Sequence, residues 1–508
     1  MSVWPRLLPL PAALVAALAL PAHGQSLIDL YESARGYDAT YQGARAQFDA
    51  SVARAAQAKA GILPAVGLSA GVNRNDLDIH VISGSQQGSA SRDFNTQSAG
   101  INATQPIYRP AAWATYEQGK LQAEVAQAVL TSAEQDLIVR VSQTYFDVLA
   151  SQDSLALVRA QKVAVAEQLA SAKRNFEVGT STITDSREAQ ARYDLVIAQE
   201  IAAENDLQVK KIVLDQLVGR PGSVPVPLAA PVVLPVATPT DMNVWVAQAE
   251  EVHPSIRQAR LGLDVAGLEV KKAEAGHKPT LDANLGYNIS RNPTGTSTAT
   301  VGTRVNAASI GVVFNMPLFA GFATENRIRE TLALEEQSRQ ILESTRRSVT
   351  QATRAAYLGL VSGAGQVKAL EAAESSSQSA LDANRLGYQV GVRINIDVLN
   401  SQSQLFQTKR DLAQARYNVL LGNLKLRQAN GTLVPEDLQA INATLAPPGT
   451  AGAAASAVTP SAATQSPVPV APTTIPTVPP VPQQPFNPLP PVMPTAPPPP
   501  VILSPPVR

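Results

Sequence analysis

The chain has 508 residues with 41 basic and 41 acidic side chains, so its net charge gives no indication of a nucleic-acid partner or of an acidic partner surface. It contains no cysteine, which excludes disulfides, thiolate metal ligands and a lipid-modified N-terminal cysteine. After the N-terminal segment, no apolar run reaches the roughly eighteen residues that a transmembrane helix needs, so a membrane role would require β-strands.

The N-terminal segment has the layout of a cleaved secretory signal. It combines a basic Arg6, a Leu- and Ala-rich stretch from Leu7 to Leu20, and small residues at Ala22 and Gly24. We predict that residues 1–24 are removed and that the mature protein is exported.

Two proline-rich segments divide the rest of the chain. Residues 446–508 hold more than half of the 39 prolines and a single charged side chain, which predicts an extended, disordered tail. A second such segment, residues 220–240, is interpreted as a linker. It separates a first structural repeat, residues 25–219, from a second, residues 241–445.

The two halves follow the same order. Each begins with a helical segment that ends at a proline, in GILPAVGLSAGVN and in GHKPTLDANLGYN, and each continues with alternating apolar and polar residues. In the second half this alternation runs from Leu281 to Ile289 and again from Ala308 to Met316. The first half has matching strands from Val66 to Val72 and near Ile101 to Tyr108. Each half therefore predicts one β-hairpin, with four strands in total.

Each hairpin is followed by a long helical segment. From Lys120 to Val178 the chain has neither proline nor glycine and is rich in good helix formers. At about 1.5 Å per residue, one helix over this range would be about 88 Å long. Apolar residues such as Ile138, Val141 and Tyr145 recur at steps of three and four, which indicates packing against neighbouring helices, as in a coiled coil.

Four amphipathic strands are too few for one chain to close a transmembrane barrel. The smallest such barrels have about eight strands, and an open sheet edge cannot be left in lipid. We therefore expect several chains to share one barrel. Two chains would give eight strands and three would give twelve, and the strand pattern alone does not decide between them.

Several features together resemble the TolC family of outer-membrane channel proteins. They are the signal, the duplicated order of helix, hairpin and helix, the exit phrases QPIYRPA and MPLFAGF, and the turns VG...TD and VG...ID. The resemblance covers residues 26–445. It implies a fold that is mainly α with a small β part. A long α-helical coiled-coil tunnel would carry four transmembrane β-strands per chain, completing a twelve-stranded barrel in a homotrimer.

The same resemblance implies a function and partners. The trimer would be an outer-membrane exit duct for a tripartite export machine, gated at its periplasmic tip and passing small molecules or an unfolded protein to the exterior. Its partners would be a periplasmic adaptor (membrane fusion) protein, an inner-membrane ABC or proton-driven transporter, and outer-membrane lipid, but no nucleic acid. The alternative hypothesis is a periplasmic coiled-coil adaptor or structural protein, which would explain the helices but not the alternating strands.

The sequence gives no indication of enzymatic chemistry. His80, His253 and His277 are far apart and lack the spacing of metal ligands. Neither a phosphate-binding glycine loop nor a nucleophile elbow is present. We expect no enzyme activity, no metal and no cofactor.

The segment FEVGTSTITDSREAQARY in the first half returns as GYQVGVRINIDVLNSQSQLF in the second, at an offset of 212 residues. Gly179 and Gly391 mark turns between two helices. The acids that follow them have a simple structural interpretation as caps. Asp185 with Glu188 three residues later has the form of a capping box, and Asp397 would favour a helix N-terminus.

The family resemblance implies a second role, because it locates these turns at the periplasmic tip of the tunnel. There Tyr388 and Arg393 match the donors of a gate latch, and Thr184 and Asp185 match its acceptors. The family can carry a glutamine latch residue at the position of Arg174, so a latch role for Arg174 is left open.

Asp397 also matches the inward-facing acidic ring that lines the family's periplasmic constriction. One turn further on, the family usually has a second aspartate, whereas this chain has Asn400. A homotrimer would therefore have three fewer negative charges at its mouth, and we expect a weaker preference for cations.

Overall fold

The computed structural model describes residues 24–446, apart from positions 82–87, 230–231, 233, 236 and 298–300. The predicted signal, except for its last residue, and the predicted tail from residue 447 onward lie outside the described residues. No helix within the described part is both long enough and apolar enough to cross a membrane.

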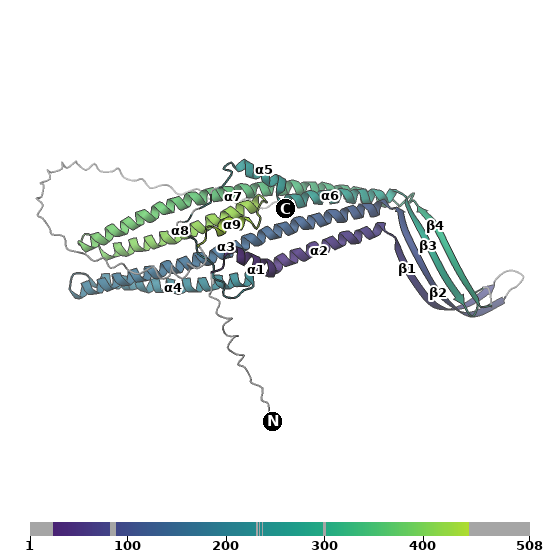
Figure 1. The fold of residues 1–508 in the computed structure, drawn as a ribbon, viewed down its shortest axis with the longest axis horizontal. Helices are drawn as coiled ribbons and strands as arrows, with labels where there is room; N and C mark the ends of the chain where they lie inside the picture. Colours follow the sequence, from purple (N-terminus) through teal and green to yellow (C-terminus); the bar gives the residue numbers. More distant parts are fainter. Residues whose placement is uncertain are drawn as a thin grey trace, which may run out of the picture. The chain divides into compact units, whose positions relative to one another are not determined.

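The described chain runs twice through the order helix, helix, strand, strand, helix, helix (Figure 1). It is mainly helical with one small sheet, which agrees with the prediction of a mainly α fold with a small β part. The first pass contains α1 (Leu27–Tyr37), α2 (Ala39–Lys59), β1 (Ala65–Val81), β2 (Gly88–Tyr108), α3 (Pro110–Glu177) and α4 (Ile183–Val218). The second contains α5 (Met242–Val252), α6 (Pro254–Glu274), β3 (Thr280–Asn292), β4 (Thr303–Asn315), α7 (Ala323–Gln389) and α8 (Asn395–Ala429), and a short α9 (Asp437–Asn442) follows.

Local sequence sets several helix ends. Pro110 and Pro254 are the first residues of α3 and α6, where a missing N–H group costs no helical hydrogen bond. Ser26 caps α1 in a reciprocal capping box with Asp29. Gly219 ends α4 with a φ of +73°, a conformation that favours glycine.

Helix α3 starts ten residues before the predicted Lys120 and includes Gly119. A Cβ atom on Gly119 would lie 3.1 Å from the Cβ of Ala58 and 3.2 Å from the Cα of Ala55, both in α2. The glycine therefore permits close packing of α2 on α3 instead of ending the helix. With 68 residues, α3 is about 100 Å long.

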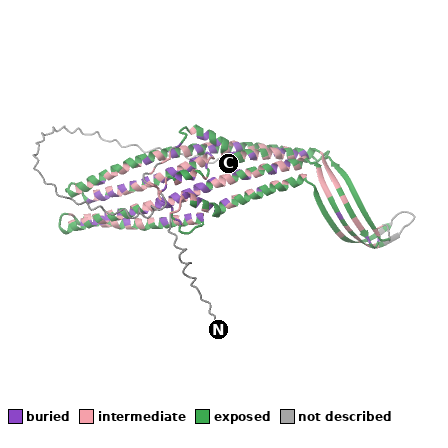
Figure 2. Cartoon of the chain, in the orientation of Figure 1, coloured by how far each residue is buried: buried purple, intermediate pink, exposed green. Residues whose placement is uncertain are grey.

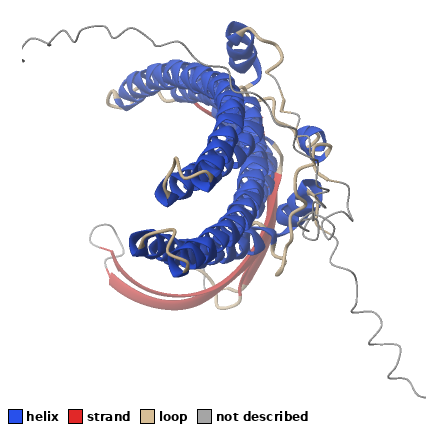
Figure 3. Cartoon of the chain, turned by 90° about the vertical axis from the view of Figure 1, so that its left-hand side faces the viewer, coloured by secondary structure: helices blue, strands red, loops and turns tan. Residues whose placement is uncertain are grey.

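The four strands form one antiparallel sheet in the order β1-β2-β3-β4, which is strongly curved (Figure 3). The two repeats join through β2 and β3, where Ile101 lies opposite Tyr287. The second-half strands lie close to the prediction, with Met316 just beyond β4. The first-half strands are longer than predicted, because backbone pairing continues past the apolar alternation through polar positions such as Asn73 opposite Thr96.

Figure 2 shows much of β1 and β4 as exposed, and the exposed residues of the sheet include large apolar side chains. Leu68 on β1 is 79% exposed and Ile310 on β4 is 87% exposed. Within the described residues, β1 and β4 each have one edge without a neighbouring strand. The sheet therefore exposes both an apolar face and two open edges.

The long helices pack as predicted for a coiled coil. Buried residues recur every seven positions along α8, at Val398, Leu405, Leu412, Val419 and Leu426. A strict seven-residue repeat keeps one apolar seam facing the neighbouring helix and favours a left-handed supercoil.

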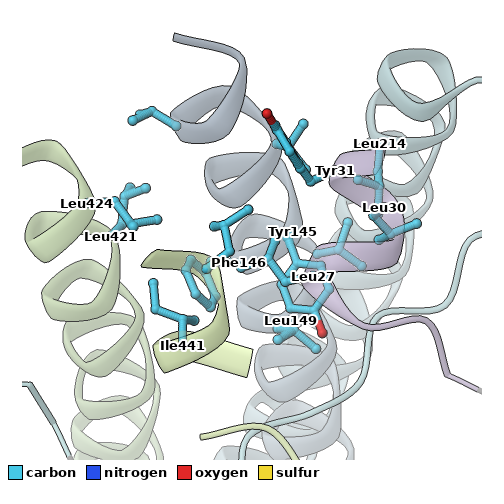
Figure 4. Close-up of a cluster of buried hydrophobic side chains, with 14 of the residues drawn as sticks. Leu27, Leu30, Tyr31, Tyr145, Phe146, Leu149, Leu214, Leu421, Leu424 and Ile441 are labelled. Carbon is cyan, nitrogen blue, oxygen red and sulfur yellow. The ribbon is translucent and has the colours of Figure 1, made fainter. Parts of the chain in front are cut away.

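The largest buried cluster lies midway along α3, where α1, α4, α8 and α9 meet it (Figure 4). Tyr145, Phe146 and Leu149 of α3 are at its centre and are each at most 2% exposed. The rings of Tyr145 and Phe146 pack edge to face at 5.7 Å, and Phe146 lies 5.8 Å from the ring of Tyr417 in α8. This cluster ties the two repeats together.

The predicted linker, 220–240, packs against the helices at several points. The Tyr145 hydroxyl donates a 2.8 Å hydrogen bond to the backbone carbonyl of Val226. Gln25 forms a backbone bridge with Pro225, and Leu228 forms one with Leu445. These contacts hold both ends of the described chain against the middle of the helices.

Candidate functional site at the paired helix turns

The two repeated turns have the same backbone. Gly179 and Gly391 adopt φ values of +79° and +77°, which are unfavourable for residues with a Cβ atom. In the first turn, the Thr180 amide donates to the Asn175 carbonyl at 2.8 Å, and in the second the Val392 amide donates to the Gly387 carbonyl at 2.8 Å.

The side chains that follow the glycine differ between the turns. In the first, Thr182 is the N-cap of α4: its hydroxyl accepts from the Asp185 amide, and the Asp185 carboxylate accepts from the Thr182 amide. The Ser181 hydroxyl donates to the same carboxylate at 2.6 Å. Asp185 is therefore part of a capping box, but as its third helical residue. The predicted pairing of Asp185 with Glu188 as a capping box is wrong, because Thr182 begins the box three residues earlier.

These hydrogen bonds set the charge state of Asp185. Partial burial raises the pKa of this carboxyl, but the hydrogen bonds from Ser181 and Thr182 outweigh that effect and hold it below its usual value of 3.8. Because the folded-state pKa is lowered, the stabilising contribution is complete above pH 3.8 and is lost as the pH falls through the lowered pKa.

In the second turn, Ile394 takes the place of Thr182 and provides no side-chain cap for α8. Arg393 takes the place of Ser181, and its Nη1 atom lies 3.7 Å from the Oδ2 atom of Asp397, an ion pair between exposed or partly exposed groups. In this chain, Arg393 thus faces the acid of its own turn, as Ser181 faces Asp185.

The unequal capping leads to a first prediction. Thr182→Ala should destabilise the start of α4 by about 1 kcal/mol, because it removes an N-cap hydroxyl. Hydrogen exchange at the amides of Ile183 to Ser186 should accelerate about fivefold at neutral pH. Ile394→Ala is the matched control, since Ile394 makes no capping hydrogen bond. Equal acceleration in the two turns would contradict this assignment.

Four side chains connect the two turns. Asn395, the first residue of α8, is completely buried. Its Oδ1 atom accepts from Gln168 of α3 at 2.5 Å, and its Nδ2 atom donates to the backbone carbonyl of Asp185 at 3.2 Å. Asn175 donates to the hydroxyl of Tyr388 at 3.2 Å. Asn395 therefore binds both helices of the first repeat at once.

A further contact lies about one turn along the helices. Arg192 of α4 donates from Nη2 to the Oδ1 atom of Asn400 in α8 at 2.9 Å. Asn400 therefore forms a hydrogen bond between the two repeats. It is also the position at which the sequence departs from the family pattern.

The predicted latch residues lie near one another but are not bonded to one another within one chain. Tyr388, Arg393 and Asp185 line the same polar groove, with a volume of about 770 Å³, whereas Thr184 is exposed and does not line it. Among the described residues, no hydrogen bond or ion pair joins Tyr388 or Arg393 to Thr184 or Asp185. Tyr388 accepts a hydrogen bond from Asn175 in this arrangement.

Four residues of this site were not predicted from the sequence: Asn395, Gln168, Asn175 and Arg192. A signal for Asn395 was present, because at the offset of 212 it replaces the apolar Ile183. A polar residue that replaces an apolar one in a repeat points to a buried hydrogen bond. No comparable signal identifies Gln168, which is one of many polar residues on α3.

The described residues provide no metal centre: no three His, Cys, Asp or Glu side chains gather there in a way that could hold a metal ion. His253 acts structurally as the N-cap of α6, where its Nδ1 atom accepts from the amide of Ser255 at 3.1 Å. The chemistry of the paired turns is thus that of hydrogen bonds and exposed charges.

Comparison with known proteins identifies the family. The model of the family described as outer membrane efflux protein matches residues 30–220 and 245–432. The chain belongs to this outer membrane efflux protein family. The resemblance inferred from the sequence is thereby confirmed, and members of this family are outer-membrane transport proteins, not enzymes.

Individual relatives of the efflux protein family span nearly the same length. Outer membrane protein TolC of Vibrio cholerae is 33% identical over 441 residues, covering 87% of this chain and 98% of the relative. Proteases secretion protein PrtF of Dickeya chrysanthemi is 28% identical, covering 83% of this chain and 91% of the relative. The crystal structure of the Vibrio cholerae outer membrane protein VceC matches the fold with a TM-score of 0.68 at 18% identity, covering 80% of this chain and 96% of VceC.

Proposed function

We propose that three copies of this chain form an outer-membrane exit duct that passes small molecules or an unfolded protein from an inner-membrane transporter to the exterior. The observation that carries the proposal is the four-stranded sheet with two open edges and an exposed apolar face. Open edges are not tolerated in lipid, so neighbouring copies must pair with β1 and β4. Three such sheets would close one twelve-stranded barrel, and the long helices would continue from it as a periplasmic tunnel.

The proposed partners follow from the family. A periplasmic adaptor protein and an inner-membrane ABC or proton-driven transporter would complete the machine. The name of PrtF, a proteases secretion protein, supports a protein substrate, and the family description, outer membrane efflux protein, supports a role in efflux.

We propose that the paired turns form the periplasmic gate. Asn395, Asn175 and Arg192 support this role, since they tie the second repeat to the first by a few polar contacts. In the closed trimer, Tyr388 and Arg393 would act as the latch donors toward Thr184 and Asp185. Several weak contacts keep such a gate shut, and a docking partner need only bind the open state more tightly to release it.

Membrane fractionation and bilayer recording test the duct. The purified protein should come from the outer-membrane fraction as a trimer that dissociates on heating in detergent, and it should conduct ions in a planar lipid bilayer. A monomeric product in the soluble periplasmic fraction would overturn the proposal and support the adaptor alternative.

The constriction residues provide a second prediction. Asp397→Asn should lower the ratio of cation to anion permeability toward one, because it removes three carboxylates from the mouth of the trimer. Asn400→Asp should raise the ratio by a smaller step, because Arg192 would pair with the new carboxylate. The reversal potential in a KCl gradient measures both changes. An unchanged reversal potential in Asp397→Asn would leave Asp397 with only the role of stabilising the helix N-terminus.

A further inference from the structure

The outward face of the sheet is apolar near the helices and becomes basic towards the hairpin ends. On β3 and β4, the outward residues pair across the strands as Leu281 with Phe314, Ala283 with Val312, Leu285 with Ile310 and Tyr287 with Ala308. All of these side chains are apolar. Two pairs further from the helices, Arg291 lies directly opposite Arg304.

Within the part of the chain that the structure describes, this arginine pair has no anionic partner. Both side chains are exposed, and neither makes an ion pair or a side-chain hydrogen bond within the described residues. Like charges directly opposite each other destabilise a sheet, so an anion bound between the two guanidinium groups would stabilise this part of it. The other two arginines of the strands are satisfied: Arg74 pairs with Asp93 at 3.1 Å, and Arg92 donates to the carbonyl of Thr296.

The two guanidinium groups border a surface hollow of about 550 Å³. Gln97 adds an amide to its rim, while Val72 and Ile289 contribute apolar side chains. A cationic rim beside an apolar floor is complementary to an amphiphile that carries a phosphate next to acyl chains. Guanidinium groups are well suited to the phosphate, which they can bind through two parallel hydrogen bonds.

The position of the arginine pair along the strands is also consistent with a phosphate-bearing amphiphile. A transmembrane strand needs about 9–11 residues, and the apolar outward series from Leu281 to Ile289 has that length. Arg291 and Arg304 then lie at the far boundary of the apolar band, at the end away from the helices. Asp76 and Asp93 lie nearer the hairpin tip of β1 and β2, and Arg74 neutralises Asp93.

We propose that Arg291 and Arg304 bind the phosphate of an acidic, phosphorylated glycolipid in the outer leaflet of the membrane. The proposal rests on the outer-membrane position of the sheet in the proposed function. The lipid would neutralise the arginine pair and fix the height of the sheet in the bilayer.

Lipid binding to the full-length protein in nonionic detergent tests the site. The probes are diphosphoryl lipid A, the same lipid after removal of its phosphates, and inorganic phosphate. The wild-type protein should bind the diphosphoryl form at least about tenfold more tightly than the dephosphorylated form. Arg291→Gln/Arg304→Gln should lose this preference, whereas Arg92→Gln, whose guanidinium has a partner within the chain, should keep it.

Three outcomes would overturn the proposal: no preference in the wild-type protein, a preference that survives the double substitution, or displacement of the lipid by equimolar inorganic phosphate. Ion conductance of the double variant, recorded in a bilayer that lacks phosphorylated glycolipid, separates this test from that of the duct. If the double variant conducts ions and has lost the lipid preference, both the duct and the lipid site are supported. If it conducts ions and retains the preference, the lipid site is refuted and the duct is not.

Discussion

Replacing Asn395 with alanine is expected to raise the open probability of the channel by at least about tenfold. The substitution removes two partly buried hydrogen bonds per chain and leaves the amide of Gln168 and the carbonyl of Asp185 without this partner. Leaving a buried polar group unpaired costs about 1–3 kcal/mol, and in the proposed gate this cost would fall on the closed arrangement, because the same groups would reach water once the helices separate. Single-channel recording in a planar bilayer measures the change.

Two further variants give this prediction a graded control. Asn395→Asp keeps an acceptor for Gln168 but buries a carboxylate against the backbone carbonyl of Asp185, so its open probability should be at least as high as that of Asn395→Ala. Arg393→Ser should have a smaller effect, since the exposed ion pair with Asp397 stabilises by only about 0.2–1 kcal/mol. If a correctly assembled Asn395→Ala trimer has the same open probability as the wild type, these contacts do not hold the gate closed. Unchanged conductance in Arg393→Ser would remove Arg393 from the latch.

Phe146→Ala is expected to lower the stability of each chain by about 3–5 kcal/mol. Phe146 is 2% exposed and lies between the rings of Tyr145 and Tyr417, so truncation leaves a cavity where both repeats meet. The temperature at which the purified protein loses its helical circular dichroism should fall clearly below that of the wild type. Loss of the heat-dissociable trimer should accompany it.

Phe176→Ala is the matched control for this prediction, because it removes the same side chain from the same helix α3. Phe176 is 43% exposed in the chain, and its truncation should cost less than about 1 kcal/mol. If both variants melt at the same temperature, the cluster around Phe146 is not the main source of stability.

The fold was predicted from two features of the sequence: the duplicated order of helices and hairpins, and the alternation of apolar and polar residues in the strands. The pattern from Leu281 to Ile289 located a strand, because one face of the sheet is apolar and the other polar. The first-half strands were predicted to end too early, because residues 73–76 are polar on both faces while their backbone pairing continues. Helix α3 was predicted to start too late, because Gly119 serves close packing on α2 and does not break the helix.

The candidate site was only partly predictable. The duplicated segment indicated both turns and their glycines, because the positive φ of each turn favours a glycine that is visible in the sequence. The hydrogen bond from Gln168 to Asn395 joins residues 227 positions apart, and such a contact depends on how the two helix pairs pack. Asp185 was interpreted with the wrong capping partner, because Thr182 and Glu188 both have the spacing of a capping box and only the position of the helix start distinguishes them.

The unequal capping of the two turns also orders their formation. In the first turn, Ser181, Thr182 and Asp185 form local side-chain hydrogen bonds, whereas α8 begins without a side-chain cap and the side chain of its first residue, Asn395, bonds to α3 and α4. During synthesis and folding the first repeat emerges earlier and can complete its turn alone. We expect the start of α8 to be completed against that surface, so that the first repeat would serve as a template for the second.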